Sequence, residues 1–300
     1  MVCPCVASPW RSGLSQKVTA SIVLYNHSAQ DVGPLFEDLA NDAALSEWVI
    51  VDNGGADDAC AVAQSLGARC LKSGRNLGYG TAHNLALRSL AAVPAPYHLI
   101  LNPDIRFQSG ALAELAAVMD AMPHVGLLMP RVLYPSGSTQ YLCKLLPTPF
   151  DLLARRFARG PLRRLFDRRM AGYDMKHFDY SRPAYVPVLS GCFMVTRRSV
   201  LESIGGFDER YFLYMEDTDL CRRIGDISRL LFWPYTTVSH AHAQGSYKNI
   251  SLLFHHIGSA IAYFNKWGWW RDPIRDARNT AGLTEAGIDS ARIQRVPRNG

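Results

Sequence analysis

The first half of the chain alternates between short apolar runs and segments in which apolar residues recur with helical spacing. Such alternation is typical of βαβ units, which build a mostly parallel sheet with helices on both faces. The predicted strands are Ala20–Tyr25, Trp48–Asp52, Ala68–Lys72, Tyr97–Leu101 and Gly126–Met129. The predicted helices are Asp31–Asp42, Asp57–Leu66, Tyr79–Leu90 and a helix that follows an N-cap at Ser109 and ends at Met122.

The second half of the chain has a weaker pattern. Residues 135–185 are rich in proline, arginine and aromatic residues, show little periodicity and are predicted to form an insertion. The last 20 residues are polar, lack a repeating apolar pattern and are predicted to be disordered. Between them the pattern predicts a strand pair in Val186–Thr196, helices Arg198–Ile204 and Ser251–Lys266, and strands Leu230–Trp233 and Thr236–Ser239.

The composition indicates a globular protein. The 300 residues suffice for one large domain or two closely joined halves, and 48% of them are apolar. No apolar run is long enough to span a membrane, and the N-terminus lacks the apolar core of a signal peptide, so a cytoplasmic protein is expected. The seven cysteines are scattered without CxxC spacing, which argues against a zinc site and a disulfide framework.

The positive charge is concentrated in one segment. The net charge is +6, and residues 151–169 carry seven arginines between leucine and phenylalanine residues. A basic amphipathic segment at an anionic membrane surface is the favoured interpretation, ahead of a solvated arginine face and of nucleic-acid binding. Gly160-Pro161 should divide the segment into two short helices.

The most informative motif is Asn102-Pro103-Asp104, which directly follows a predicted buried strand. Pro103 ends the strand and stiffens the tip, so Asp104 is held where open α/β sheets bind their ligands. A carboxylate there suits a divalent cation, and such a cation suits a diphosphate. The alternative is an ordinary turn between a strand and the next element.

Two other predicted strands end in polar residues at the same edge. Tyr25-Asn26 follows the first strand, and Asp52 ends the second, where its carboxylate could accept a hydrogen bond from a uracil or thymine imide. A glycine-rich loop, Ser73–Gly80, precedes a predicted helix. Its amides could bind phosphate with help from Arg75, although a dinucleotide site is disfavoured because the spacing is not G-x-G-x-x-G.

A second acidic motif lies within an aromatic stretch. Glu216 and Asp217 follow apolar residues that predict a partly buried setting, which raises carboxyl pKa values and suits general-base catalysis. The alternative, an acidic first turn of a helix, is favoured for Asp219. In His240-Ala241-His242 one histidine can face a cation shared with Asp104, and His240 is the chosen candidate.

These motifs together resemble glycosyltransferase family 2, which has the GT-A fold and an inverting mechanism, and within it bacterial rhamnosyltransferase-like enzymes. The matching segments, in the order of that family, are SIVLYN, VIVDNGGADD, SGRNLGYGTAHN, LILNPDI, LSGCFMVTRRSVLESIGGFDERYFLYMEDTDLCRR and VSHAHAQGSYKN. The resemblance covers about residues 18 to 270.

The resemblance implies a role for each motif. Asn102 and Asp104 stand at the metal motif, with Mg²⁺ or Mn²⁺ as the cofactor, and His240 completes the metal shell. Asp217 matches the catalytic base, and Glu216 orients the acceptor or that base. The nucleotide-binding residues are then Tyr25, Asn26, Asp52, Arg75, Asn76, Asn102 and Asp104.

The implied reaction is transfer of a sugar, with rhamnose favoured, from a nucleotide diphosphate sugar such as dTDP-rhamnose. The expected acceptor is a saccharide or lipid-linked saccharide in bacterial surface polysaccharide synthesis, at the inner membrane. The alternatives are a sugar nucleotidyltransferase and a non-catalytic carbohydrate-binding module. The expected organisation is a flexible extension (1–17), a nucleotide-sugar-binding half (18–135), an acceptor-binding half with the arginine-rich insertion (136–275) and a flexible tail (276–300).

Overall fold

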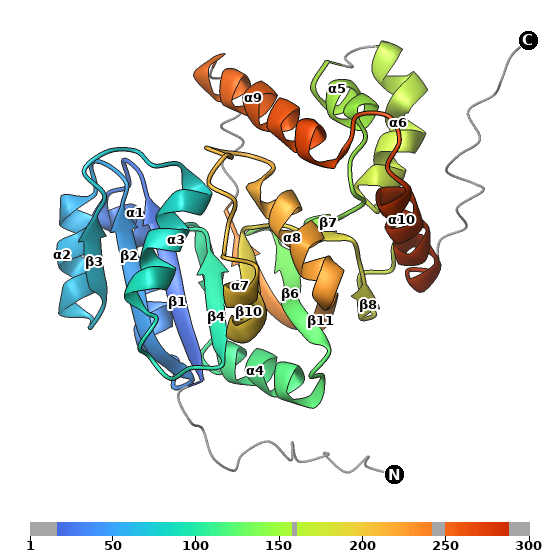
Figure 1. Ribbon diagram of the computed structural model, residues 1–300. Helices are drawn as coiled ribbons and strands as arrows, with labels where there is room; N and C mark the ends of the chain where they lie inside the picture. Colours follow the sequence, from blue (N-terminus) through green and yellow to red (C-terminus); the bar gives the residue numbers. More distant parts are fainter. Residues whose placement is uncertain (1–16, 158–160, 242–249, 288–300) are drawn as a thin grey trace, which may run out of the picture.

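The computed structural model describes residues 17–157, 161–241 and 250–287. Its centre is a nine-stranded sheet in the order β3-β2-β1-β4-β10-β6-β11-β5, in which β8 pairs with β11 outside this path, and helices cover both faces (Figure 1). Strands β1 to β4 are parallel to one another, and β6 is parallel to β11. Strand β10 is antiparallel to both β4 and β6, and β5 and β8 are antiparallel to β11. This is the mostly parallel α/β sheet that the sequence predicts.

The elements of the described residues follow the alternation of the sequence. The strands are β1 (Val18–Leu24), β2 (Leu45–Asp52), β3 (Arg69–Lys72), β4 (Tyr97–Leu101), β5 (Ile105–Phe107), β6 (Val125–Leu133), β7 (Cys143–Lys144), β8 (Ala184–Tyr185), β9 (Val188–Leu189), β10 (Phe193–Arg197) and β11 (Arg229–His240). The helices are α1 (Ala29–Ala40), α2 (Asp57–Ser65), α3 (Tyr79–Ser89), α4 (Ala111–Ala121), α5 (Pro149–Phe157), α6 (Pro161–Tyr173), α7 (Arg198–Ser203), α8 (Glu216–Ile227), α9 (Ile250–Trp267) and α10 (Pro273–Glu285).

The central strands are buried because both faces of the sheet are covered. All of β1 is buried. Ile22 and Ile50 belong to the large core cluster that includes the buried faces of α1 and α2, whereas Val23 and Val51 pack with the alanines of α3. Adjacent side chains of a strand point to opposite faces, so these pairs place α3 on one side of the sheet and α1 and α2 on the other.

Several predicted boundaries need correction. Ser109 is not the N-cap of α4: its hydroxyl donates to the Asn41 carbonyl, and Gly110, at φ +91°, precedes the helix. The two short strands predicted after Leu230 form one strand, β11, because a register shift between Trp233 and Thr237 lets it continue along β6. Residues 135–185 contain β7, α5, α6 and β8, and the helices α5 and α6 lie on either side of the predicted break at Gly160-Pro161.

The predicted flexible tail is wrong in its first part, because α10 occupies Pro273–Glu285. Asp272 caps this helix by accepting from the Arg275 amide, and Leu283 is buried. The amide side chain of Asn279 bonds both the amide and the carbonyl of Leu146, which fastens the helix to the segment after β7. The helix escapes prediction because few of its residues are apolar, and polar bonds contribute to its docking.

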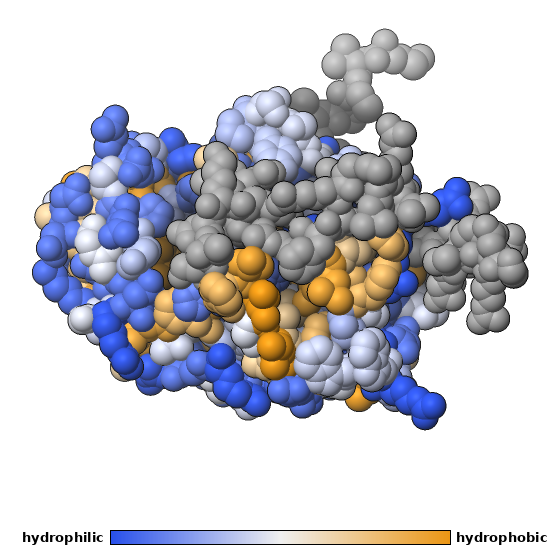
Figure 2. Space-filling view, turned by 90° about the horizontal axis from the view of Figure 1, so that it is seen from above, coloured by the Kyte–Doolittle hydropathy of each residue, from blue (hydrophilic) through white to orange (hydrophobic). Residues whose placement is uncertain are grey.

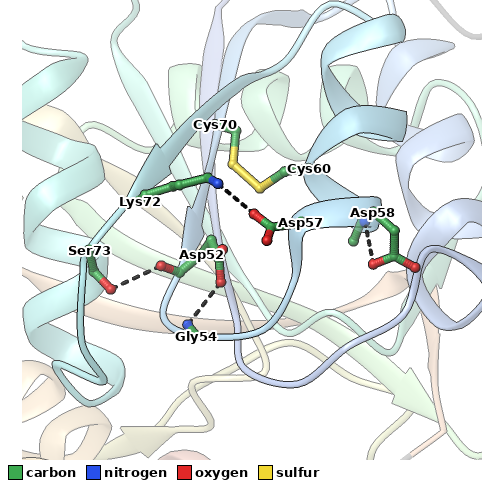
Figure 3. Close-up of a disulfide and its surroundings, with 9 residues drawn as sticks. Asp52, Gly54, Asp57, Asp58, Cys60, Cys70, Lys72 and Ser73 are labelled. Carbon is green, nitrogen blue, oxygen red and sulfur yellow. Dashed lines mark hydrogen bonds and ion pairs between the residues drawn. A yellow bond between two sulfur atoms is a disulfide. The ribbon is translucent and has the colours of Figure 1, made fainter.

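The structure also contains a disulfide that the cysteine spacing does not predict. Cys60 in α2 and Cys70 in β3 are bonded, and an ion pair between Lys72 and Asp57 joins the same two elements (Figure 3). The pairing depends on β3 lying beside α2, which no local spacing motif indicates. Three further cysteines, Cys143, Cys192 and Cys221, are buried thiols.

A buried polar network lies inside the first half of the sheet. The hydroxyl of Ser21 lies 2.7 Å from His83 Nδ1 and 2.8 Å from His98 Nε2, while Thr19 Oγ1 lies 2.9 Å from His98 Nδ1. Burial lowers the pKa of His83 to about 3 and lowers that of His98 well below its usual value. Both imidazoles are therefore neutral in the folded protein at neutral pH.

These histidines predict acid-sensitive folding. The unfolded chain takes up protons on them near pH 6.5 and the folded chain does not, so each costs about 1.4 kcal/mol of stability per pH unit as the pH falls below 6.5, until the folded pKa is reached. Urea unfolding at pH 7, 6 and 5 measures this slope. His83→Gln should make it shallower, and an unchanged slope in that variant would contradict the assignment.

Candidate active site

The polar ends of three strands meet at one edge of the sheet. Strands β1 and β2 are in register at Leu24 and Asp52, and β4 lies on the other side of β1 and ends at Leu101. The chain is held close where the first two strands end, because the Asn53 amide donates to Leu24 O at 2.8 Å. The residues after these strands therefore share the edge at which α/β proteins bind ligands.

Asp104 and His240 are in direct contact at this edge. Strand β5, which follows Asp104, pairs with the end of β11, so the two residues are brought together from distant parts of the sequence. His240 Nε2 lies 3.1 Å from Asp104 Oδ1, and His240 Nδ1 lies 3.0 Å from the side-chain oxygen of Gln140. The side-chain nitrogen of Gln140 also donates to the backbone carbonyl of His240 at 2.7 Å. Gln140 thus fixes the ring and leaves Nε2 facing the carboxylate.

The chemistry of this pair fits a divalent cation. A carboxylate and a neutral imidazole are both metal ligands, and a histidine whose other nitrogen is bonded to an amide oxygen is oriented for that role. Asp104 is partly exposed, which leaves it accessible to a ligand. Within the described ranges, no group of three or more histidine, cysteine, aspartate or glutamate residues could hold a metal. His242 lies outside the described residues.

Asp217 lies at the start of α8, against the segment that leads into β10. Its carboxylate accepts from the Gly191 amide at 3.2 Å and from the Thr218 amide at 2.7 Å. A Cβ atom on residue 191 would lie 3.2 Å from the Asp217 Cβ, so a glycine there allows this close approach. Two amide donors therefore hold the carboxylate in one orientation.

One short segment connects the two acidic sites. Cys192, next to Gly191, accepts a hydrogen bond from the Asn102 amide at 2.9 Å. Because β10 is antiparallel, its first residues lie at the edge where β4 ends. Tyr79 donates to Gly191 O at 2.8 Å, and its pKa is raised by burial and by the nearby acids, which include Glu216, Asp217 and Asp104. The predicted catalytic and metal-binding acids are therefore close together.

Glu216 is a buried acid beside Asp217. In the part of the chain that the structure describes, its Oε2 atom has no hydrogen-bond partner. Burial, with repulsion from Asp217, raises its pKa to about 8. At neutral pH the Glu216 carboxyl group is therefore protonated and can donate a hydrogen bond, whereas a general base must be ionised. This difference supports Asp217 as the base.

The backbone before these acids is strained. Tyr214 and Met215, neither of them glycine, have positive φ values of 68° and 67°. Residues in this conformation cost of order 1–3 kcal/mol and persist where their surroundings hold them. Helix α9 contributes here: Ser259 donates to Leu213 O at 2.9 Å, and the ring of His256 packs on Tyr214 at 4.8 Å. The position of the candidate catalytic acids therefore depends on α9.

The predicted nucleotide-binding residues lie at the ends of β1 and β2. Tyr25 is half exposed and its ring covers Gly54. Asn26 adopts φ +54°, and its amide donates to Gly54 O at 2.8 Å. Asp52 is buried, and its carboxylate accepts from the Gly54 amide at 2.8 Å (Figure 3). These residues form a turn with an exposed aromatic face beside a carboxylate.

Three amides of the glycine-rich loop are bonded within the protein, so these three are not free to bind a phosphate. The amides of Leu77 and Gly78 donate to the side chains of Asn53 and Asn76, and the Tyr79 amide donates to Phe212 O. Asn76 thus stabilises the loop, while Arg75 is exposed.

A glycine is required at residue 78, because this residue has φ +81° and a Cβ atom there would lie 2.1 Å from the Phe212 carbonyl oxygen. The loop fastens α3 to the segment before α8.

Asp219 lies in the acidic first turn of α8, as predicted. It is fully buried and contacts Arg223, Lys266 and the Trp267 indole at 2.7 to 2.8 Å. Arg222 instead pairs with Asp272. Other side chains at the site were not predicted from sequence. Gln140 lies in the stretch interpreted as an insertion, and Tyr79 lies in a helix that was expected only to follow a phosphate-binding loop.

Comparison with known proteins assigns the chain to a family. The family model of "Glycosyl transferase family 2" matches residues 19–205. The chain is 32% identical over 245 residues to N-acetylglucosaminyl-diphospho-decaprenol L-rhamnosyltransferase of Mycobacterium tuberculosis, covering 76% of this chain and 78% of that protein. It is 24% identical over 229 residues to rhamnosyltransferase WbbL of Escherichia coli K12, covering 74% and 83%. The chain belongs to glycosyl transferase family 2 and is a glycosyltransferase.

A solved structure supports the fold. GalNAc-T7 with UDP, GalNAc and Mn²⁺ superposes with a TM-score of 0.61 at 14% identity. The match covers 84% of this chain and 48% of that one, so this chain corresponds to about half of its length. The GT-A fold expected from the sequence is confirmed. Family membership also argues against the alternative that the chain is a non-catalytic carbohydrate-binding module.

Proposed function

We propose that this enzyme transfers rhamnose from dTDP-rhamnose to a saccharide that is attached through diphosphate to a polyprenyl lipid. The activities for which two relatives are named support the sugar, and that of the mycobacterial relative supports the lipid acceptor. The observation that carries the proposal is the contact of Asp104 with His240 beside Asp217, since it provides a place for a diphosphate next to a base. A sugar nucleotidyltransferase is disfavoured because no glycine- and lysine-rich loop follows β1.

In the proposed reaction, an acceptor hydroxyl oxygen attacks the anomeric carbon of the donor as the bond to the diphosphate oxygen breaks, and the configuration inverts. Asp217 takes the hydroxyl proton, and the Gly191 and Thr218 amides keep its carboxylate in place. Asp104 and His240 would hold Mg²⁺ or Mn²⁺, which when bound neutralises charge on the leaving diphosphate. Asp52 and Tyr25 would bind the thymine base, one through its imide and one through its ring.

The proposal predicts a small effect for Glu216→Gln at neutral pH. Because Glu216 is protonated below a pKa of about 8, the neutral amide replaces a neutral acid of similar shape, and transfer at pH 7 should stay within a few-fold of wild type. Above pH 8 the wild-type carboxyl ionises beside Asp217, so its activity should change there, whereas the variant should lack that inflection. Initial rates from pH 6 to 9.5 test this. A hundredfold loss at pH 7 would contradict it.

A panel of nucleotide sugars tests the donor. Purified enzyme with Mg²⁺ or Mn²⁺ is incubated without acceptor, and release of the nucleoside diphosphate is measured. Hydrolysis of dTDP-rhamnose above that of UDP-glucose, UDP-N-acetylglucosamine and GDP-mannose supports the proposal. Preference for another sugar would overturn the donor assignment, and release of pyrophosphate from dTTP and a sugar phosphate would favour the nucleotidyltransferase.

We also propose that the enzyme works at the cytoplasmic face of the inner membrane. No helix among the described residues is long and apolar enough to cross a bilayer. The arginines of residues 151–169 and the exposed Trp269 and Trp270 favour attachment to an anionic surface, whereas Trp267 is turned inward toward Asp219. Flotation with anionic liposomes at low salt tests this, and protein that stays at the bottom contradicts it.

A further inference from the structure

An apolar groove of about 230 Å³ lies between α5 and α9. Leu152 and Leu153 line one side, Ile257 and Ile261 line the other, and Trp269 closes one end. Leu153, Ile257, Ile261 and Trp269 are exposed, so the groove is open to solvent. Figure 2 shows hydrophobic residues gathered near the middle of the face that is seen from above. Exposed aliphatic side chains in one groove mark a binding site more often than scattered ones do.

The groove is connected to the catalytic segment through α9. His256 lines the groove, and its ring also packs on Tyr214, two residues before Glu216. Phe264, another lining residue, belongs to a small core cluster with Met215. One side of α9 therefore faces the groove and another supports the backbone that positions the acids. A molecule in the groove lies one helix away from the proposed reaction centre.

Positive charge lies between the groove and Asp217. Lys144, in β7, is partly buried, and among the described residues its ammonium group makes no ion pair. Burial and the charge of Arg155 lower the pKa of Lys144, while the carboxylates of Asp217 and Asp174 raise it. Arg155 extends from α5, the helix that also carries Leu152 and Leu153, and lies 3.7 Å from Asp174. Arg155 thus shares a helix with the groove, and Lys144 interacts electrostatically with both Arg155 and the proposed base.

This arrangement is complementary to an anionic lipid. A partly buried ammonium without a counter-ion is costly, and a bound anion removes that cost. Apart from His256, the adjoining groove is lined by apolar residues, so a molecule that fits both parts has a charged group joined directly to a hydrocarbon chain. A groove that binds a protein would be expected to contain polar groups that form hydrogen bonds with it as well.

We infer that the α5–α9 groove binds the first isoprene units of the polyprenyl acceptor, and that Lys144 and Arg155 bind its diphosphate. The inference rests on the proposed lipid-diphosphate acceptor and assigns its binding residues. The saccharide then lies on the far side of the diphosphate from the lipid, toward Asp217. A second copy of this chain is the rival occupant of the groove.

The experiment compares three acceptors of known chemistry: the methyl and farnesyl esters of N-acetylglucosaminyl diphosphate, and a neutral farnesyl ether of N-acetylglucosamine. The first two compounds are diphosphate diesters and are called the methyl diester and the farnesyl diester. For the wild type, KM should be about tenfold or more lower for the farnesyl diester than for the methyl diester, because burial of about 55 Å² of apolar surface is enough for a tenfold change in affinity. Ile257→Asp with Ile261→Asp should remove the difference. Ile227→Asp, which changes an exposed isoleucine at the far end of α8, should keep it.

The charged part of the site has its own control. Lys144→Met should raise KM for the farnesyl diester by about tenfold to a hundredfold and leave KM for the neutral ether unchanged, because only the diester carries the anion. Lys176→Met, at an exposed lysine, should change neither value. Equal KM values for methyl and farnesyl diesters in the wild type would overturn the inference, as would a Lys144 effect of the same size on the neutral ether.

Hydrolysis of the donor without acceptor separates this inference from the proposed function. If every variant hydrolyses dTDP-rhamnose like the wild type and the acceptor preferences are absent, the groove assignment is wrong and the proposed function stands. If the wild type hydrolyses no nucleotide sugar, the proposed function is wrong. Loss of a dimer in the Ile257→Asp, Ile261→Asp variant, measured by sedimentation, with the farnesyl preference retained, would assign the groove to a second copy and overturn the inference.

Discussion

Asp217→Asn is expected to lower the rate of sugar transfer by about 10²–10⁴-fold, the usual contribution of a general base. The asparagine side chain has the shape of the carboxylate, and its single oxygen can still accept from the Thr218 amide, although the bond from the Gly191 amide is lost. The fold and the donor site should therefore be preserved. The asparagine cannot take a proton from the acceptor. Transfer rates at saturating donor, measured together with the affinity for dTDP, separate loss of chemistry from loss of binding.

A matched control lies on the same helix. Asp226, near the opposite end of α8, pairs with Arg278 at the surface and has no place in the proposed reaction. Asp226→Asn should keep wild-type transfer. If Asp217→Asn transfers sugar at the wild-type rate, another group is the base, and Glu216 would be the first to test.

Asp104→Ala is expected to weaken metal-dependent binding of dTDP by about a hundredfold, because loss of even an outer-sphere partner of a metal ligand costs 10–100-fold. Calorimetric titration of dTDP into the protein, with Mg²⁺ and then with EDTA, measures the effect. The wild type should bind weakly in EDTA, and the variant should bind weakly in both. Equal affinity of the wild type with and without metal would contradict the assignment.

A substitution of Gln140 should have a smaller effect than the loss of Asp104, one of the two proposed metal ligands. Gln140→Leu leaves both proposed ligands in place and removes the hydrogen bonds that orient His240, together with one from the Gln140 side chain to the Leu133 carbonyl. We expect an intermediate loss of metal-dependent affinity. A loss as large as that of Asp104→Ala would mean that His240 cannot occupy its position without this support.

The sheet and its functional edge were predictable because they depend on local patterns. Buried strands such as Tyr97–Leu101 are continuous apolar runs, and a parallel sheet places all their carboxyl ends together. It follows from the topology alone that Asp52 and Asp104 share an edge. To predict the contact between Asp104 and His240, one must also know that β5 pairs with β11. This pairing is not visible in the sequence because β5 has only three residues.

The missed features depend on contacts between distant segments. Lys144 lies in a two-residue strand whose position comes from its pairing with β9, and no periodicity marks so short an element. The amides of the glycine-rich loop are satisfied partly by Phe212, more than a hundred residues away, so the sequence of the loop could not show that they were occupied. The docking of α10 by Asn279 is hidden for the same reason.

The bond between Cys60 and Cys70 has a practical consequence. It joins α2 to β3, and the backbone amide of Ser73, just after β3, donates to the Asp52 carbonyl. Asp52 lies at the turn that is proposed to bind the nucleotide base. A sample prepared in dithiothreitol and a sample prepared in air are therefore different covalent species close to this turn. Dissociation constants for dTDP are comparable between laboratories only after free thiols have been counted in each batch.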